Sequence, residues 1–300
     1  MHSLAGVYAA AVTPLKADFS PDLEAIPPLL DFFAGRGCHG ALMLGTTGEG
    51  PSFSPDERLQ ILRAALDVRT EHPAFRLLAG TGTPSLTETI GLTRTAFDLG
   101  YEAVVVLPPY YFRNVTEDGL FAYFSELIRR AFPEDGRLLI YHIPSLTGVA
   151  LPLSLLKRLK EAFPRQFVGL KDSSHQEDFA RQMGDSFGED LAVLTGTDSF
   201  LQLALESHAI GCITAPANLI SPDLRRVWDD CQAGVAETQS QEHVAAIRHI
   251  LEKYAPFPPI LKALLARLHG FPLWPVRPPL IEVSAEKGEQ ALVEMEAEGI

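Results

Sequence analysis

Two kinds of segment alternate along most of the chain. Eight short runs are mostly apolar, and longer stretches with apolar residues at helical spacing separate them. Runs that are apolar throughout, rather than at every second position, are typical of parallel strands that helices cover. The predicted strands cover residues 7–12, 41–44, 76–80, 103–107, 137–141, 167–170, 191–194 and 211–214.

The stretches between these strands are predicted to be helices. Capping signals mark several of their starts, including Ser54 with Glu57, and Thr116 ahead of Glu117. The predicted helices cover residues 23–33, 55–68, 86–99, 117–132, 153–162, 176–187, 199–207 and 222–231. Eight strand–helix units in about 220 residues predict a (β/α)8 TIM barrel. A doubly wound open sheet is the alternative.

The last part of the chain has helical periodicity without strands. From about residue 237 the pattern runs through HVAAIRHILEKYA and LKALLARLHG, and Pro256, Pro258 and Pro259 interrupt it. We therefore predict a barrel domain in residues 1–235 and a C-terminal helical extension in residues 236–300.

Composition predicts a soluble cytoplasmic protein. No run approaches the roughly 20 apolar residues of a membrane span, and the start LAGVYAAAV lacks the basic leader of a signal peptide. The three cysteines form no CxxC motif and are predicted to be buried thiols. A net charge of -13 argues against nucleic acid and anionic membranes as partners, because both require clusters of Lys and Arg. An anionic substrate would need local donors, such as backbone N–H groups.

One lysine is a candidate for catalysis because of its position. Lys171, in FVGLKDSS, is the one lysine of seven in an apolar strand, and barrel enzymes carry their chemistry at the carboxyl ends of the strands. Removal from water favours the neutral amine, which can attack a ketone and form a Schiff base. The alternative is a lysine that extends to water or pairs with Asp172.

Tyr141 ends the preceding strand and would face the same mouth of the barrel as Lys171. A Schiff-base enzyme needs a group that moves protons, and a phenol can serve. The alternative is a core tyrosine whose hydroxyl is bonded internally.

The loop GTTGEG, residues 45–50, follows the second predicted strand. It lacks both the GK[ST] ending of a P-loop and the GxGxxG spacing, so a nucleotide phosphate is not expected there. Its N–H groups could hold a carboxylate without a cation, although an ordinary turn would have the same sequence. Because His142, His175 and His208 are far apart and no phosphate loop follows the last strands, we expect neither a metal nor a flavin.

The motifs together indicate a family. The segments AVTPL, GTTGEG, LPPYYFRNVTEDGLFAYF, YHIPSLTG, VGLKDSS, TGTDSFL and VRPPL follow one another along the whole chain. In this order they resemble the dihydrodipicolinate synthase / N-acetylneuraminate lyase family of class I, pyruvate-handling aldolases.

The resemblance implies roles for five residues. Lys171 would form a Schiff base with pyruvate, without any further cofactor, and Tyr141 would position and shuttle the proton. Thr46 and Thr47 would hold the pyruvate carboxylate, mainly through backbone N–H groups. Tyr111 would reach into a neighbouring subunit's site and join a relay with Thr47 and Tyr141. The family also implies a homotetramer built as a dimer of dimers.

Two departures from the family pattern bear on the substrate. Dihydrodipicolinate synthases carry an arginine where Leu146 stands, and that arginine grips the carboxylate of aspartate semialdehyde. A leucine cannot form this bidentate contact. The pattern of lyases that act on sialic acid has a glutamate where Ser199 stands.

We therefore predict a lyase that cleaves or forms a carbon–carbon bond between pyruvate and an aldehyde. The preferred substrate is a 2-keto-3-deoxy sugar acid or another 4-hydroxy-2-oxo acid. Dihydrodipicolinate synthase, N-acetylneuraminate lyase and a dehydratase that uses the same imine are alternatives. A barrel that binds a 2-oxo acid and regulates without turnover is the alternative from another class. The predicted contacts with substrate hydroxyls are Ser173, Gly196, Asp198 and Asn218.

Overall fold

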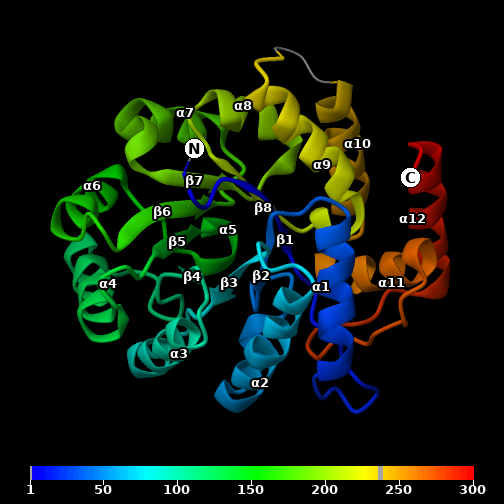
Figure 1. The fold of residues 1–300 in the computed structure, drawn as a ribbon, viewed down its shortest axis with the longest axis horizontal. Coiled ribbons are helices and arrows are strands. Elements are labelled where there is room, and N and C mark those ends of the chain that lie inside the picture. The colour runs from blue at the N-terminus through cyan, green and yellow to red at the C-terminus, as the bar shows by residue number, and fades with distance from the viewer. Residues whose placement is uncertain (1, 236–238) are drawn as a thin grey trace.

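Eight parallel strands close into a barrel in chain order, with β1 paired to both β2 and β8 (Figure 1). The computed structural model describes residues 2–235 and 239–300. The strands are β1 Gly6–Ala10, β2 Gly40–Met43, β3 Arg76–Gly80, β4 Ala103–Val106, β5 Leu138–His142, β6 Phe167–Asp172, β7 Ala192–Thr195 and β8 Gly211–Thr214. The predicted TIM barrel is confirmed, and the open sheet is excluded.

Helices surround the barrel, as Figure 1 shows. They are α1 Ile26–Gly35, α2 Pro55–Ala65, α3 Leu86–Asp98, α4 Glu117–Ala131, α5 Pro144–Thr147, α6 Leu153–Ala162, α7 Glu177–Phe187, α8 Leu201–Glu206 and α9 Ala217–Gln232. Short 3-10 turns are η1 Leu23–Ala25, η2 Gly50–Ser52, η3 Leu66–Thr70, η4 Gly188–Asp190 and η5 Asp198–Phe200.

The largest differences from the predicted helices concern α9 and α5. The helix predicted from residue 222 begins at Ala217, and Ile220 has non-helical backbone angles inside it. Pro222 explains this kink, because a proline inside a helix removes one backbone hydrogen bond and crowds the preceding turn. The short helix α5 was not predicted, since four residues are too few to show helical periodicity.

Three helices, α10 Gln239–Lys253, α11 Phe257–His269 and α12 Ala285–Ala297, lie on one side of the barrel near α9 (Figure 1). Their apolar side chains, such as Ile247, Leu264 and Met295, belong to the same core cluster as the outer face of the barrel. The predicted domain boundary lies between residues 235 and 236. Because residues 236–238 lie outside the described residues, the two-domain division stays a prediction. No helix in residues 2–235 and 239–300 is long and apolar enough to cross a membrane.

Side chains on the strands alternate between the inside of the barrel and the surrounding helices. Leu139 and Tyr141 of β5 belong to the inner cluster, whereas Ile140 belongs to the outer one. In the register between β5 and β6, Tyr141 stands opposite Lys171. The two side chains therefore share the inner face at the carboxyl end of the barrel.

Candidate active site

A cavity of about 510 Å³ opens at the carboxyl ends of the strands, where barrel enzymes carry out their chemistry. Of the predicted site residues, those that line it are Thr46, Thr47, Tyr141, Leu146, Lys171, Ser173 and Gly196. Asp198 and Tyr111 are not among its lining residues. The structure thus brings seven of the predicted site residues to one cavity.

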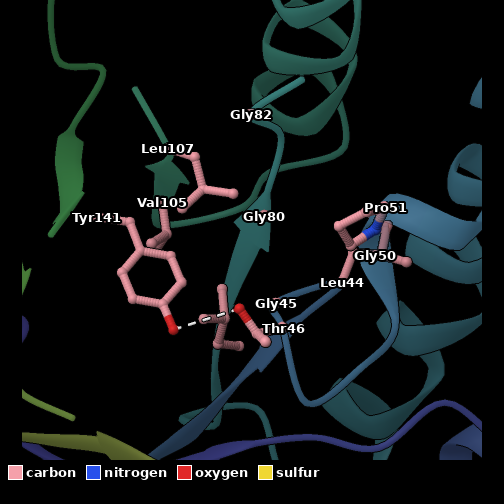
Figure 2. Close-up of a pocket in the computed structure, with 11 residues that line it drawn as sticks. Leu44, Gly45, Thr46, Gly50, Pro51, Gly80, Gly82, Val105, Leu107 and Tyr141 are labelled. Atoms are coloured by element: carbon pink, nitrogen blue, oxygen red, sulfur yellow. Dashed lines mark hydrogen bonds between the residues drawn. The ribbon is translucent and has the colours of Figure 1, made fainter. Parts of the chain in front are cut away.

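Lys171 and Tyr141 are in direct contact inside this cavity. Lys171 is only 3% exposed, and its Nζ lies 4.2 Å from the centroid of the Tyr141 ring. The Tyr141 hydroxyl lies 3.4 Å from that of Thr46, as the dashed line in Figure 2 marks. Burial opposes ionisation of Tyr141, but the charge of Lys171 and the hydrogen bond with Thr46 outweigh it and lower its pKa below the ordinary value.

The loop that follows β2 is held in a strained conformation. Leu44 and Glu49 both adopt left-handed backbone angles, which cost non-glycine residues free energy and often occur at functional sites. The Glu49 N–H donates to the carbonyl of Thr46. Within the described part of the chain, no recorded hydrogen bond engages the amide N–H groups of Thr46 and Thr47. These two donors are available to an anion.

Glycines let the neighbouring segments approach this loop closely. Figure 2 shows Gly45 next to Thr46, and Gly50 next to Leu44 and Pro51. A Cβ at Gly50 would lie 2.0 Å from the carbonyl oxygen of Leu44. The glycines of GTTGEG therefore serve close packing as well as the turn itself.

Asp198, a predicted contact to substrate hydroxyls, is instead fully buried in an ion pair. Its Oδ1 accepts from Thr214 Oγ1 at 2.7 Å and from Arg248 Nη1 at 2.8 Å. Arg248 lies on α10, and its Nε donates to Glu252 at 2.7 Å. Because Arg248 is engaged by two carboxylates, its charge is already balanced before any substrate binds.

Asn218 is likewise engaged by the backbone. Its amide group donates to the carbonyls of Ala10 and Ala215 and accepts from the N–H of Val12. With no exposed surface, Asn218 holds the start of α9 against β1. Its predicted contact with substrate would require these bonds to break.

Tyr111 stands in the loop after β4 and is 76% exposed. Its ring packs edge-on against Phe112, which is also exposed. In the described part of the chain, the Tyr141 hydroxyl interacts with the side chains of Thr46 and Ser173, and no bond to Thr47 is found. The relay through Thr47 and Tyr111 therefore stays a prediction that needs a second subunit.

Sequence reasoning missed the contribution of the C-terminal helices to the cavity. Arg248 and Glu252 of α10 line it, together with the segment 255–258 that leads into α11. Arg248 follows Val244 by four residues and precedes Leu251 by three, so it lies on the buried face of α10. A charged residue on the apolar face of an amphipathic helix was the signal that could have revealed it.

His175 also lines the cavity, at its rim. Its backbone is left-handed, and its Nδ1 lies 3.5 Å from the Thr197 hydroxyl. Burial, and then the charge of Arg248, lower the pKa of His175 below its ordinary value. The imidazole is therefore mostly neutral at neutral pH.

A family model described as the dihydrodipicolinate synthetase family matches residues 3–298. The chain belongs to this family. It is 38% identical over 283 residues to an uncharacterised DapA-like lyase of Chloroflexus aurantiacus, a match that covers 94% of this chain and 93% of the relative. It is 29% identical to the 4-hydroxy-tetrahydrodipicolinate synthase of Symbiobacterium thermophilum, over 96% of both chains.

The crystal structure of dihydrodipicolinate synthase from Agrobacterium tumefaciens superposes with a TM-score of 0.89 at 30% identity, covering 98% of this chain and 99% of that one. Membership of the dihydrodipicolinate synthetase family makes the protein a carbon–carbon lyase of the class I aldolase type. The family resemblance predicted from the motifs is confirmed.

The buried pair of Arg248 and Asp198 makes a prediction about stability. Replacing Arg248 by Met leaves a buried carboxylate without its partner, so we expect the free energy of unfolding to fall by about 3–5 kcal/mol. Arg181→Met removes an exposed pair with Glu177 and should cost less than about 1 kcal/mol. Chemical denaturation of both variants measures the difference, and equal losses would contradict the role of burial.

Proposed function

We propose that Lys171 forms an imine with the ketone carbon of a 2-oxo acid and that the protonated imine accepts the electrons of the carbon–carbon bond that breaks. The observation that carries this proposal is the contact between Lys171 and Tyr141. The amine is buried, and its recorded neighbour is an aromatic ring rather than a carboxylate. An amine at this position, with no carboxylate paired to it in the described residues, can attack the ketone carbon of a bound 2-oxo acid.

The carboxylate of the 2-oxo acid would bind to the loop 44–49. Thr46 and Thr47 line the cavity, and their amide N–H groups have no recorded internal partner in the described chain. Successive N–H groups in a tight turn bind anions without a charged side chain. This arrangement also suits a protein with a net charge of -13, in which binding of an anion depends on local donors.

Tyr141 would act as the base in the cleavage direction. Ionised Tyr141 takes the proton of the substrate's 4-hydroxyl group, and the C4–O bond becomes a carbonyl. The electron pair of the C3–C4 bond moves into the protonated imine and gives an enamine. A proton then adds to C3, and water hydrolyses the imine to release pyruvate and the free amine. The lowered pKa of Tyr141 favours its part in this sequence.

The substrate we propose is a 4-hydroxy-2-oxo acid whose aldehyde half carries no carboxylate, such as a 2-keto-3-deoxy sugar acid. Leu146 is 58% exposed at this end of the cavity and offers no charge. Arg248 is balanced by Asp198 and Glu252, so the three groups together carry a net negative charge. A second carboxylate would bind there at an electrostatic cost.

Ser173 and Gly196 remain the proposed contacts to substrate hydroxyls, because both line the cavity. Because a relative is named as a 4-hydroxy-tetrahydrodipicolinate synthase, that activity is the main alternative. N-acetylneuraminate lyase, an imine-dependent dehydratase and a regulatory barrel without turnover are further alternatives. The predicted homotetramer also stays a prediction.

The proposed imine at Lys171 can be trapped as a covalent adduct. Incubation with pyruvate followed by borohydride should reduce the imine and attach the pyruvate carbon skeleton to Lys171, as peptide mass spectrometry would locate. Lys171→Met should abolish the adduct, whereas Lys253→Met, which removes the pair with Glu294 of α12, should retain it. An adduct that is absent, or that lies on another lysine, would refute the mechanism.

The charge balance of the cavity makes a prediction about specificity. In the condensation direction with pyruvate, uncharged hydroxyaldehydes should react with a kcat/KM about tenfold or more above that of aspartate semialdehyde. Among the described residues that line the cavity, a second carboxylate finds no unpaired cation besides Lys171. Steady-state kinetics over a panel of aldehydes measures this ratio. Efficient turnover of aspartate semialdehyde would instead favour the synthase.

A further inference from the structure

A second buried ion pair joins the carboxylate loop to the C-terminal helices. Lys262 of α11 donates to Glu49 Oε1 at 2.5 Å. The two side chains are 1% and 0% exposed, although they stand 213 residues apart in the chain. Removing both charges from water is costly, and an apolar pair of similar volume often serves stability as well or better. A reason other than stability is therefore worth seeking for this pair.

The pair holds Glu49 in a strained backbone conformation. Glu49 has a φ of 55°, and its N–H donates to the Thr46 carbonyl. The preceding carbonyl, that of Gly48, accepts from the Thr13 hydroxyl at 2.7 Å. The conformation of Glu49 is thus coupled through one hydrogen bond to the residue whose amide is proposed to bind the substrate.

Both ends of the pair are fixed by further bonds. Glu49 Oε2 accepts from the backbone N–H of Arg277 at 2.9 Å, and Lys262 Nζ also donates to the carbonyl of Pro275 at 2.7 Å. Arg277 in turn donates to the carbonyl of Ser52 at 2.7 Å. The segment 275–277 and the Lys262 side chain of α11 therefore hold the loop. Glu49, Lys262 and Arg277 themselves do not line the cavity.

We propose that Lys262 is a positioning residue for the loop that receives the substrate carboxylate, so that α11 sets the affinity of the active site for the 2-oxo acid. The inference rests on the proposed function in one respect, namely that Thr46 and Thr47 bind this carboxylate. Without the ammonium group of Lys262, the Glu49 carboxylate would be buried without its charged partner. It would then turn toward water, and the left-handed backbone would relax along with the Thr46 amide.

The proposal separates binding from chemistry. Lys171 and Tyr141 lie on β6 and β5, and their contact does not involve the loop backbone. Loss of Lys262 should therefore weaken binding of the 2-oxo acid while leaving the reaction of the saturated enzyme nearly unchanged. A residue that served stability alone would change neither quantity in the folded protein.

The test compares Lys262→Met with Lys253→Met. Lys253 pairs with Glu294 between α10 and α12, so its removal affects the C-terminal helices without touching the loop. Calorimetric titration with pyruvate should give a dissociation constant about 10- to 100-fold higher for Lys262→Met, the effect of losing well-placed bonds to a charged group. The value for Lys253→Met should stay within about twofold of wild type. In condensation kinetics, Lys262→Met should raise the pyruvate KM by a similar factor with kcat within a few-fold.

A double variant keeps the test decisive if Lys262→Met does not fold. Glu49→Gln combined with Lys262→Met removes both charges, so no uncompensated charge is buried. The ion pair that holds the loop is nevertheless lost. It should unfold at nearly the wild-type denaturant concentration and still bind pyruvate weakly. Wild-type affinity for pyruvate in either folded variant would overturn the proposal.

Failure of the proposed chemistry gives a different result. A wild-type chain that binds pyruvate in the calorimeter but yields no borohydride adduct would contradict the imine at Lys171. The dissociation constants of the Lys262 variants would still decide the positioning role, because the titration does not depend on a covalent bond.

Discussion

A charge that folding removes from water must find a partner, and this requirement organises the mouth of the barrel. Glu49 is paired with Lys262 and Asp198 with Arg248. In both pairs the cation comes from the C-terminal helices and the anion from a loop that follows a strand. The helices therefore do more than cover the barrel, since they complete the charge balance of the segments that form the cavity.

Lys171 differs from these paired cations. It is equally buried, but it contacts the ring of Tyr141 instead of a carboxylate. A buried amine that no carboxylate engages can attack the ketone carbon of a bound 2-oxo acid, which is the first step of imine formation. The substrate could supply the anion that Lys171 lacks. Its carboxylate would be held by the nearby amides of Thr46 and Thr47.

The fold and the inner face of the site could be predicted because their signals are local. Apolar strands mark the barrel, and Lys171 and Tyr141 are visible as polar residues at the ends of two such strands. The roles of Asp198 and Asn218 could not be predicted, because their partners depend on tertiary packing: Arg248 comes from a helix 50 residues further along, and Asn218 bonds to the backbone of β1. Glu49 lies inside the GTTGEG motif, but no residue near it in the sequence indicated that Lys262 would be its ion-pair partner.

The central claim is that a 2-oxo acid is held between the amine of Lys171 and the amides of Thr46 and Thr47. The most direct measurement is a crystal structure of the protein after reaction with pyruvate and reduction with borohydride. The account predicts continuous density from Lys171 Nζ to the pyruvate C2 atom, with the carboxylate within hydrogen-bond distance of both amides. A carboxylate bound instead to Arg248, or density on another lysine, would contradict it.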